Sequence, residues 1–223
     1  MNILNFCKAI ALTAVTSIAL MHAPARADTV DFNSHPSPVY PVPGGVINSG
    51  GFTFSAPWVG VVNGSESGWQ FGVGNNSPML VFFGDGTDFL TVSRTNGGLF
   101  SLSSVDVGRW LGLDQATPET LSPNASLSIT GYTGSGFTGA HQILAPFTLP
   151  GFTNNFSTLS IPQQFPSLSF QSLTFHLSAY TPGGYVAVDN LVLTPVPEPE
   201  TYALLLAGLG LLAVIGRRRK TLG

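Results

Sequence analysis

The sequence predicts an all-β protein, folded as an antiparallel β-sandwich of the jelly-roll type. Charged residues make up only 9% of the chain, whereas aromatic and β-branched residues, which favour strands over disorder, are frequent. Apolar and polar residues alternate with a period of two in several segments, and turn signals separate these segments. No segment before residue 195 shows a sustained helical period.

The alternation is clearest in residues 126–132 and 173–178. In the first segment Leu127 and Ile129 are expected to face the core, and in the second Thr174 and His176 are expected to face outward. Further candidate strands are 29–33, 51–55, 58–62, 69–73, 79–83, 89–93, 99–107, 143–149, 156–161 and 185–193. Turn signals between them are Pro43-Gly44-Gly45, Asn63-Gly64, Asp85-Gly86, Asn96-Gly97-Gly98 and Pro182-Gly183-Gly184. Together they predict one domain, residues 28–195.

The N-terminus has the features of a secretory leader. Lys8 supplies a positive charge, residues 9–21 are almost entirely apolar, and Ala25-Arg26-Ala27 has the small-x-small pattern of a signal-peptidase site. The alternative is a buried N-terminal helix. We expect residues 1–27 to be a signal peptide and the mature chain to begin at Asp28. Cys7, the only cysteine, leaves with the leader, so no disulfide stabilises the mature protein.

The C-terminus combines a proline-rich hinge, an apolar run and a basic end. The run, residues 202–216, has 15 residues. As a helix it would be about 22 Å long, whereas a bilayer core is about 30 Å thick, so it is a marginal membrane span. The basic end would stay on the cytoplasmic side and leave the domain outside. Alternating prolines keep the hinge extended and open to an enzyme. This order predicts a sorting signal that anchors the protein in the inner membrane transiently and is then cut.

The residues of this tail resemble a known signal, the PEP-CTERM sorting signal of exported proteins in Gram-negative bacteria that make extracellular polysaccharide. The resemblance covers residues 196–220 and rests on Val196, Pro197, Glu198, Pro199, Arg217, Arg218 and Arg219, with the apolar run between them. It implies processing by an exosortase and delivery to the cell envelope or the extracellular matrix. A plain single-span anchor is the alternative.

A second resemblance concerns the domain itself. The segments SLSSVDVGRW, SLSITGYTGSG, FTLPGFTNNFSTLSI and VAVDNLVL follow the order found in many ectodomains that carry this signal. Such ectodomains are similar in pattern to carbohydrate-binding jelly rolls. The resemblance therefore supports the fold.

Charge excludes one class of partner. Between residues 28 and 216 only Arg94 and Arg109 are basic, against 11 acidic residues, which gives this span a net charge of 2 − 11 = −9. Such a chain will not bind nucleic acid by neutralising phosphates. Neutral sugars, cations and other proteins remain as partners.

Catalytic signals are sparse. The sequence has no HExxH motif and no centred G-x-S-x-G motif. Residues 134–139 match G-x-G-x-x-G, but no helix follows, so a hairpin loop is the interpretation. We therefore expect a non-enzymatic protein that binds or structures exopolysaccharide. The alternative is an envelope-anchored glycoside hydrolase, which would need two carboxylates flanking a sugar.

Two kinds of side chain are candidates for binding. Aromatic residues could stack on sugar rings or lie in the core; they are Trp58, Trp69, Trp110, Tyr132 and Tyr185. Asp31 and Asp189 lie on the first and last predicted strands, which often pair in jelly rolls, so a structural calcium ion could join them with help from Asn33 and Asn190. The alternative is that Asp189 only forms a bulge or a strand cap. Asp85 and Asp88 are the next metal candidates.

Overall fold

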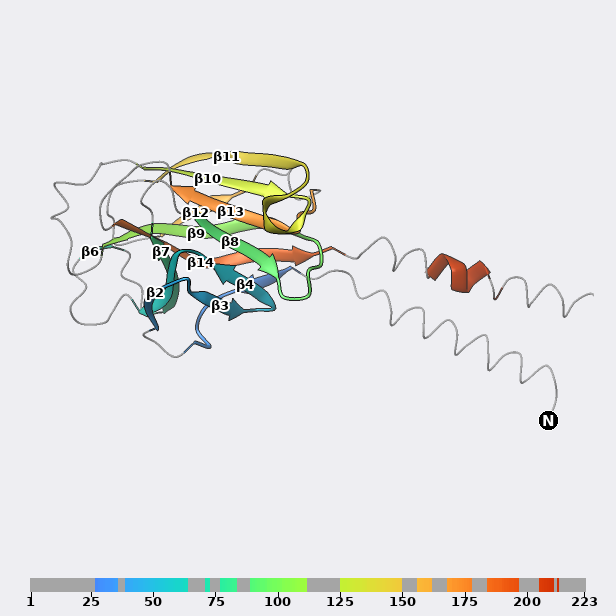
Figure 1. Ribbon diagram of the computed structural model, residues 1–223, viewed down its shortest axis with the longest axis horizontal. Coiled ribbons are helices and arrows are strands. Elements are labelled where there is room, and N and C mark those ends of the chain that lie inside the picture. Colours follow the sequence, from blue (N-terminus) through green and yellow to red (C-terminus); the bar gives the residue numbers. More distant parts are fainter. Residues whose placement is uncertain are drawn as a thin grey trace, which may run out of the picture. The chain divides into compact units, whose positions relative to one another are not determined.

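The computed structural model describes residues 27–35, 39–63, 71–72, 77–83, 89–111, 125–149, 156–161, 168–177, 184–196, 205–210 and 212. Ala27–Val196 forms one compact unit, built almost entirely of strands (Figure 1). The remaining described residues belong to the C-terminal tail. The sequence also makes predictions for residues 1–26, Pro197, Glu198, Pro199, Arg217, Arg218 and Arg219, all of which lie outside the described residues.

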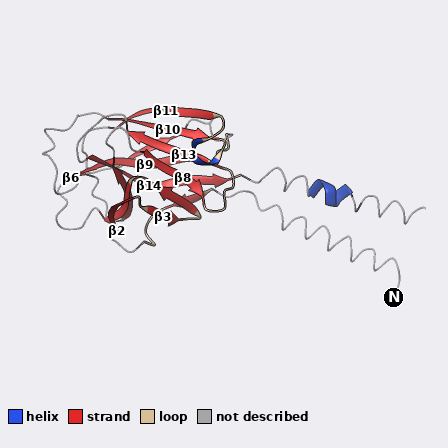
Figure 2. Cartoon of the chain, viewed as in Figure 1, coloured by secondary structure: helices blue, strands red, loops and turns tan. Residues whose placement is uncertain are grey.

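The strands of this unit form two sheets, here named A and B. Sheet A has the order β12 (Ser157–Ser160), β9 (Phe100–Leu111), β14 (Gly184–Pro195), β7 (Pro78–Phe83), β5 (Trp58–Asn63) and β2 (Val39–Pro43), with β1 (Asp28–Val30) paired to β14 and β6 (Phe71–Gly72) paired to β9. Sheet B has the order β11 (His141–Leu149), β10 (Ala125–Tyr132), β13 (Ser172–Leu177), β8 (Phe89–Arg94), β4 (Phe52–Ser55) and β3 (Val46–Ser49). Figure 2 shows the predominance of strands.

The pairing of the last eight strands confirms the predicted jelly roll. Strand β7 pairs with β14, β8 with β13, β9 with β12 and β10 with β11, and every pair is antiparallel. These pairs are nested along the chain, and successive pairs alternate between sheet A and sheet B, which is the jelly-roll arrangement. Strands β5 and β2 extend sheet A beyond β7, and β4 and β3 extend sheet B beyond β8.

Two strands, β2 and β3, were not predicted, and both lie at sheet edges. Pro41 and Pro43 argue against a strand in the sequence, but an edge strand tolerates residues without an N–H donor. The register of β2 on β5 is irregular between Val39 and Val42. Strand β3 has only four residues and directly follows the turn at Gly44. The twelve predicted strands are all present, although β1 ends at Val30.

The core lies between the two sheets, as the alternation predicts. Leu127 and Ile129 are fully buried, and the burial pattern of β10 alternates along its whole length. The ring of Phe52 on sheet B meets the ring of Phe100 on sheet A, with centroids 5.1 Å apart in an edge-to-face arrangement. Side chains from both sheets therefore pack together to form the core.

A second buried cluster lies on the outer face of sheet A. Its members are Val62, Met79, Val81 and Ala187, with Phe156 and Tyr185 packed against them. They alternate along β5, β7 and β14 with residues of the main core, so they point away from sheet B. The part of the outer face of sheet A that these residues occupy is consequently buried, whereas Trp58 on the same face is exposed.

In the tail, residues 205–210 and 212 are helical. Leu206, Leu209 and Leu212 are exposed there. Within the described part of the chain, no helix reaches the length and apolar character that a membrane span requires. The predicted anchor helix over the apolar run stays a prediction.

Candidate functional site

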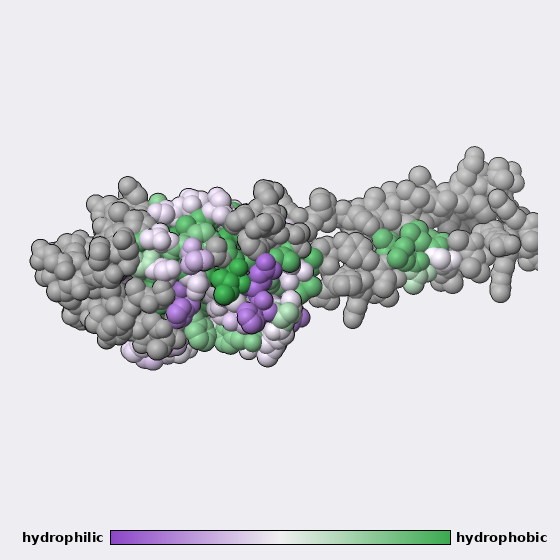
Figure 3. All heavy atoms as spheres, turned by 90° about the horizontal axis from the view of Figure 1, so that it is seen from above, coloured by the Kyte–Doolittle hydropathy of each residue, from purple (hydrophilic) through white to green (hydrophobic). Residues whose placement is uncertain are grey.

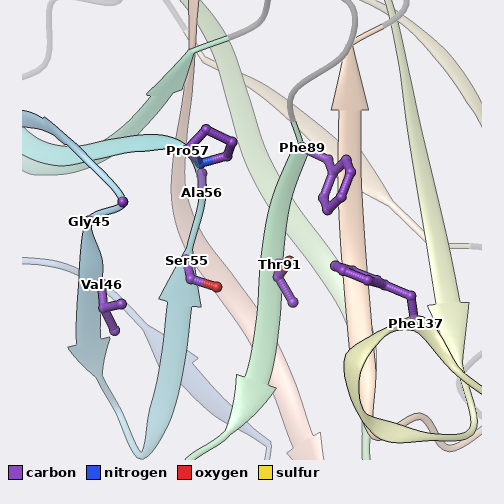
Figure 4. A pocket seen from close by; sticks show the side chains of 9 residues that line it. Gly45, Val46, Ser55, Ala56, Pro57, Phe89, Thr91 and Phe137 are labelled. Carbon is purple, nitrogen blue, oxygen red and sulfur yellow. The ribbon is translucent and has the colours of Figure 1, made fainter.

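An open groove lies on the outer face of sheet B. It is a shallow, open depression with a volume of about 310 Å³. Its lining comes from β3, β4, β8, the residues just before β3 and just after β4, and the loop between β10 and β11: Gly44, Gly45, Val46, Ser55, Ala56, Pro57, Phe89, Thr91 and Phe137. Figure 4 shows Phe89 and Phe137 on one side of this space and Gly45, Val46 and Pro57 on the other. None of these residues was predicted as a site residue.

The floor of the groove is polar and its walls are apolar. Ser55 on β4 is the cross-strand partner of Thr91 on β8 and of Val46 on β3, so the three side chains form one row across the sheet. The two hydroxyl groups can each donate and accept hydrogen bonds. Val46 is 56% exposed at the edge of this row. A ligand here would meet hydroxyl groups below and apolar groups at the sides.

The wall formed by Phe137 depends on an unusual loop. The short 3-10 helix Ser135–Phe137 contains Gly136 at φ 61° and Phe137 at φ 65°, and positive φ is costly for an aromatic residue. Two hydrogen bonds stabilise this conformation. The Gly134 N–H donates to the Thr138 carbonyl oxygen, and the Thr138 hydroxyl donates to the Ser135 carbonyl oxygen. The strained loop keeps the Phe137 ring 39% exposed.

The loop is also fixed to the sheet below it. The Ser172 hydroxyl on β13 donates to the Gly134 carbonyl oxygen at 3.0 Å. Phe137 contacts Phe89 on β8 (centroids 4.9 Å) and Tyr132 on β10 (5.6 Å), and β13 lies between these two strands. The Phe137 ring therefore lies over β13, which explains why the outward-facing Thr174 is only 6% exposed.

The outer face of sheet B carries no Asp, Glu, Lys or Arg among its described outward-facing side chains. These are Val46, Asn48, Thr53, Ser55, Phe89, Thr91, Ser93, Ser126, Ser128, Thr130, Tyr132, His141, Ile143, Pro146, Thr148, Ser172, Thr174 and His176. His176 is half-buried and faces outward, as predicted. In the space-filling view, apolar and near-white, weakly polar residues lie beside strongly hydrophilic ones on the described part of the domain (Figure 3).

Asp31 and Asp189, the predicted calcium ligands, lie just after β1 and on β14, two strands that pair. Their carboxylates, however, accept hydrogen bonds from different partners. Strands β1 and β14 do pair, with Val30 opposite Leu191, and Asp31 directly follows this pairing. The Asp31 carboxylate accepts a hydrogen bond from the Asn33 N–H at 3.3 Å. Asp189 is 2% exposed and accepts from the Ser77 hydroxyl and from the Asn190 N–H.

The residue opposite Asp189 is Asp106 on β9, which the sequence reasoning missed. The Asn190 side-chain amide donates to Asp106, and the register of β14 on β9 is irregular between Asp189 and Val192, which is the bulge named as the alternative. Asn190 has φ 48° at this irregularity. Among the described residues no group of three or more His, Cys, Asp or Glu side chains could hold a metal ion. The calcium site stays a prediction.

The other candidates are placed as follows. Trp58 is 41% exposed but does not line the groove. Tyr185 packs edge-to-face on Phe83 at 5.4 Å, and burial raises its pKa. Arg109 is buried, and desolvation lowers its pKa. The segment 134–139 joins two antiparallel strands, which confirms the hairpin interpretation. Asp85, Asp88, Trp69 and the side chain of Trp110 lie outside the described residues.

In a comparison with known families, residues 195–220 match the PEP-CTERM protein-sorting motif. The motif indicates an exported protein of the cell envelope. Its first two residues still belong to the folded domain, because Pro195 pairs with Phe100 and the Val196 N–H donates to the Leu99 carbonyl oxygen. A search among curated proteins gave no match.

Several solved structures are similar over most of the domain. They include the CBM22-1–GH10 modules of the Clostridium thermocellum endo-1,4-beta-D-xylanase 10B complexed with xylohexaose, at 11% identity and TM-score 0.39, covering 78% of this chain and 28% of that one. The CBM22-1 xylan-binding domain from Paenibacillus barcinonensis has 13% identity and TM-score 0.41, with coverages of 79% and 99%. A Stig cyclase from Fischerella sp. TAU has 14% identity and TM-score 0.41, with coverages of 77% and 99%. The fold assignment rests on the strand pairing described above.

Proposed function

We propose that this protein binds neutral polysaccharide in the cell envelope or the extracellular matrix, through the groove on the outer face of sheet B. The observation that carries this proposal is the strained, exposed Phe137. Backbone strain persists where the surrounding structure enforces it, and it concentrates at ligand sites. An exposed ring beside hydroxyl groups is suited to the apolar face and the hydroxyl rim of a sugar ring.

The absence of charged side chains among the described residues that line the groove favours a neutral ligand. An acidic polysaccharide would meet no Lys or Arg among the described outward-facing side chains of sheet B. It would also approach a chain of net charge −9, because residues 28–216 contain two basic and 11 acidic residues. Like charge disfavours such an encounter. Binding to a neutral sugar, by contrast, should depend little on salt.

Export and sorting would bring the groove to its ligand. In this proposal signal peptidase removes residues 1–27, the C-terminal helix anchors the protein in the inner membrane, and an exosortase then cuts in the tail. Intact mass spectrometry of cell-surface protein tests this order. We expect a species that begins near Asp28 and lacks Arg217 to Gly223; retention of those residues would show a permanent anchor.

The enzymatic alternative finds no support among the described carboxylates. None of them lines the groove, and Asp106 and Asp189 face each other on the outer face of sheet A within a hydrogen-bonded network. A glycoside hydrolase would need two carboxylates on either side of a bound sugar. A non-enzymatic role remains a proposal.

A glycan-binding screen with residues 28–196 tests the function. We expect binding to one or more neutral polysaccharides, weakened about tenfold by Phe137→Ala, the loss expected for one stacking contact. Trp58→Ala is the matched control, because Trp58 is 41% exposed and Phe137 is 39% exposed but only Phe137 lines the groove. Equal affinity for the wild type and Phe137→Ala would contradict the proposal.

A further inference from the structure

The ring contacts of the groove continue on the far side of Phe137. Phe137 meets Tyr132 with centroids 5.6 Å apart and planes at 72°, and Tyr132 meets His141 at 5.9 Å and 36°. Tyr132 on β10 and His141 on β11 are direct cross-strand partners. With the Phe89–Phe137 contact at 4.9 Å, four rings form a continuous line. This line crosses the strands from β8 to β11.

A row of uncharged side chains runs straight across the strands, and the ring contacts cross it diagonally, from Phe89 at the level of His176 to Tyr132 at the level of Ser172. Successive cross-strand partners are Val46, Ser55, Thr91, Thr174, Thr130 and Ile143, one from each strand of sheet B. Because neighbouring strands lie about 4.8 Å apart, the row is about 24 Å long. Val46 is 56% exposed at one end and Ile143 is 58% exposed at the other. The row is thus open at both sheet edges, and Phe137 crosses it near the middle.

We infer that the site has a second subsite at Tyr132, His141 and Ile143, and that its ligand is an extended neutral polysaccharide chain lying across the strands of sheet B. This inference rests on the proposed function of the groove. The groove includes only Val46, Ser55 and Thr91 of the row, whereas the row continues beyond Phe137 to Ile143. A chain that enters over β3 passes over Phe137 and leaves over β11.

The row is open at both of its ends, Val46 and Ile143, and this determines which part of a polysaccharide can bind. A ligand that runs out past Val46 and Ile143 is bound through its internal residues, so a free chain end is not needed. Phe137 lies between the two subsites, because its ring has Phe89 on one side and Tyr132 on the other. It would therefore contact the polysaccharide whichever subsite is occupied. Affinity should consequently rise with chain length until both subsites are occupied.

The test measures affinity against chain length for the full-length protein in detergent. The probes are xylan, glucomannan and dextran, each as polymer and as size-fractionated oligosaccharides, with alginate as the acidic comparison. We expect polymers of a bound neutral sugar to bind at least about tenfold more tightly than their disaccharides. His141→Ala and Tyr132→Ala should remove this gain, Phe137→Ala should weaken both long and short chains, and Trp58→Ala should change neither.

His141→Ala is the decisive variant, because His141 is exposed and Tyr132 also supports Phe137. If His141→Ala keeps the full gain with length while Phe137→Ala still weakens binding, the second subsite is wrong and the groove remains. If Phe137→Ala has no effect on a bound sugar, the proposed function itself fails. Tighter binding of alginate than of every neutral polymer would overturn the ligand class, and no binding to any neutral probe would overturn both proposals.

Discussion

The two outer faces of the sandwich are built from strands of the same kind, yet they differ sharply. On sheet A the outward side chains of Val62, Met79, Val81 and Ala187 are at most 1% exposed. On sheet B the outward side chains of Val46 and Ile143 are more than half exposed, and most others are hydroxyl-bearing. An alternating pattern tells which residues share a face, but not whether that face is covered. The outward side chains of sheet B are thus open to a ligand, whereas this cluster on sheet A is not.

The largest effect expected from this difference is on stability. Met79→Ala, on the outer face of sheet A, should lower the free energy of unfolding by about 2–5 kcal/mol, because Met79 is fully buried and a cavity would remain. Ile143→Ala, on the outer face of sheet B, should change it by less than about 0.5 kcal/mol. Urea unfolding of residues 28–196 measures both. Similar losses for the two variants would show that the faces are not distinct.

The sequence was sufficient for the fold because its strongest signal is local. The alternation in residues 126–132 places Leu127 and Ile129 in the core, and it does so correctly. The edge strands β2 and β3 were missed because edge strands tolerate proline and short length, which remove the local signal. Pairing between distant strands, which makes the fold a jelly roll, followed from strand number and turn spacing rather than from any one motif.

The candidate site was far less predictable. Ser55, Thr91 and Phe137 come from three segments, and only strand register brings them together. One local signal was present: Phe137 lies within Gly134-Ser135-Gly136-Phe137-Thr138-Gly139, and an aromatic residue between glycines in a hairpin loop has no core to enter. Asp106 was missed for a similar reason, because its position opposite Asp189 depends on the pairing of β9 with β14.

The next effect concerns the carboxylates on sheet A. Asp106 and Asp189 face each other directly, an arrangement that repels unless a cation or hydrogen bonds offset it. If calcium joins Asp189 to Asp31 or to Asp106, calcium at about 100 times its Kd should raise the free energy of unfolding by about 2.7 kcal/mol. Thermal melts in calcium and in chelator measure this effect.

Variants locate such a site. Asp189→Ala should remove the calcium effect, and comparison of Asp31→Ala with Asp106→Ala identifies the second ligand. Asp28→Ala is the matched control, since Asp28 is exposed at the start of β1. Identical melts in calcium and chelator would eliminate the ion, and hydrogen bonds such as those from Ser77 and Asn190 would then offset the repulsion.

A smaller effect tests the strain at Phe137 on sheet B. At φ 65° a glycine is relaxed and an alanine is not, so Phe137→Gly should be more stable than Phe137→Ala by up to about 1 kcal/mol. At Trp58, an exposed strand position, the order should reverse, with glycine less stable than alanine by roughly 0.5–1 kcal/mol. Urea unfolding of the four variants measures both differences. The same order at both positions would argue against strain in the loop.

The smallest expected effect is the pH dependence that burial gives to Tyr185 on the outer face of sheet A. Burial raises the pKa of its phenol above the ordinary value of about 10, because the ionised form loses solvation. The stability that this neutral phenol contributes is fully present below pH 10 and is lost as the pH rises toward the folded-state pKa, since the unfolded chain ionises first. Because the side chain is only partly buried, solvent screening keeps the loss to a few tenths of a kcal/mol near pH 10. Unfolding of the wild type and of Tyr185→Phe from neutral to alkaline pH measures the difference. We expect the wild type to lose more stability than Tyr185→Phe above pH 10. Parallel curves would mean that the phenol is as well solvated in the folded protein as in the unfolded chain. That result would contradict the burial of Tyr185 beside the cluster on the outer face of sheet A.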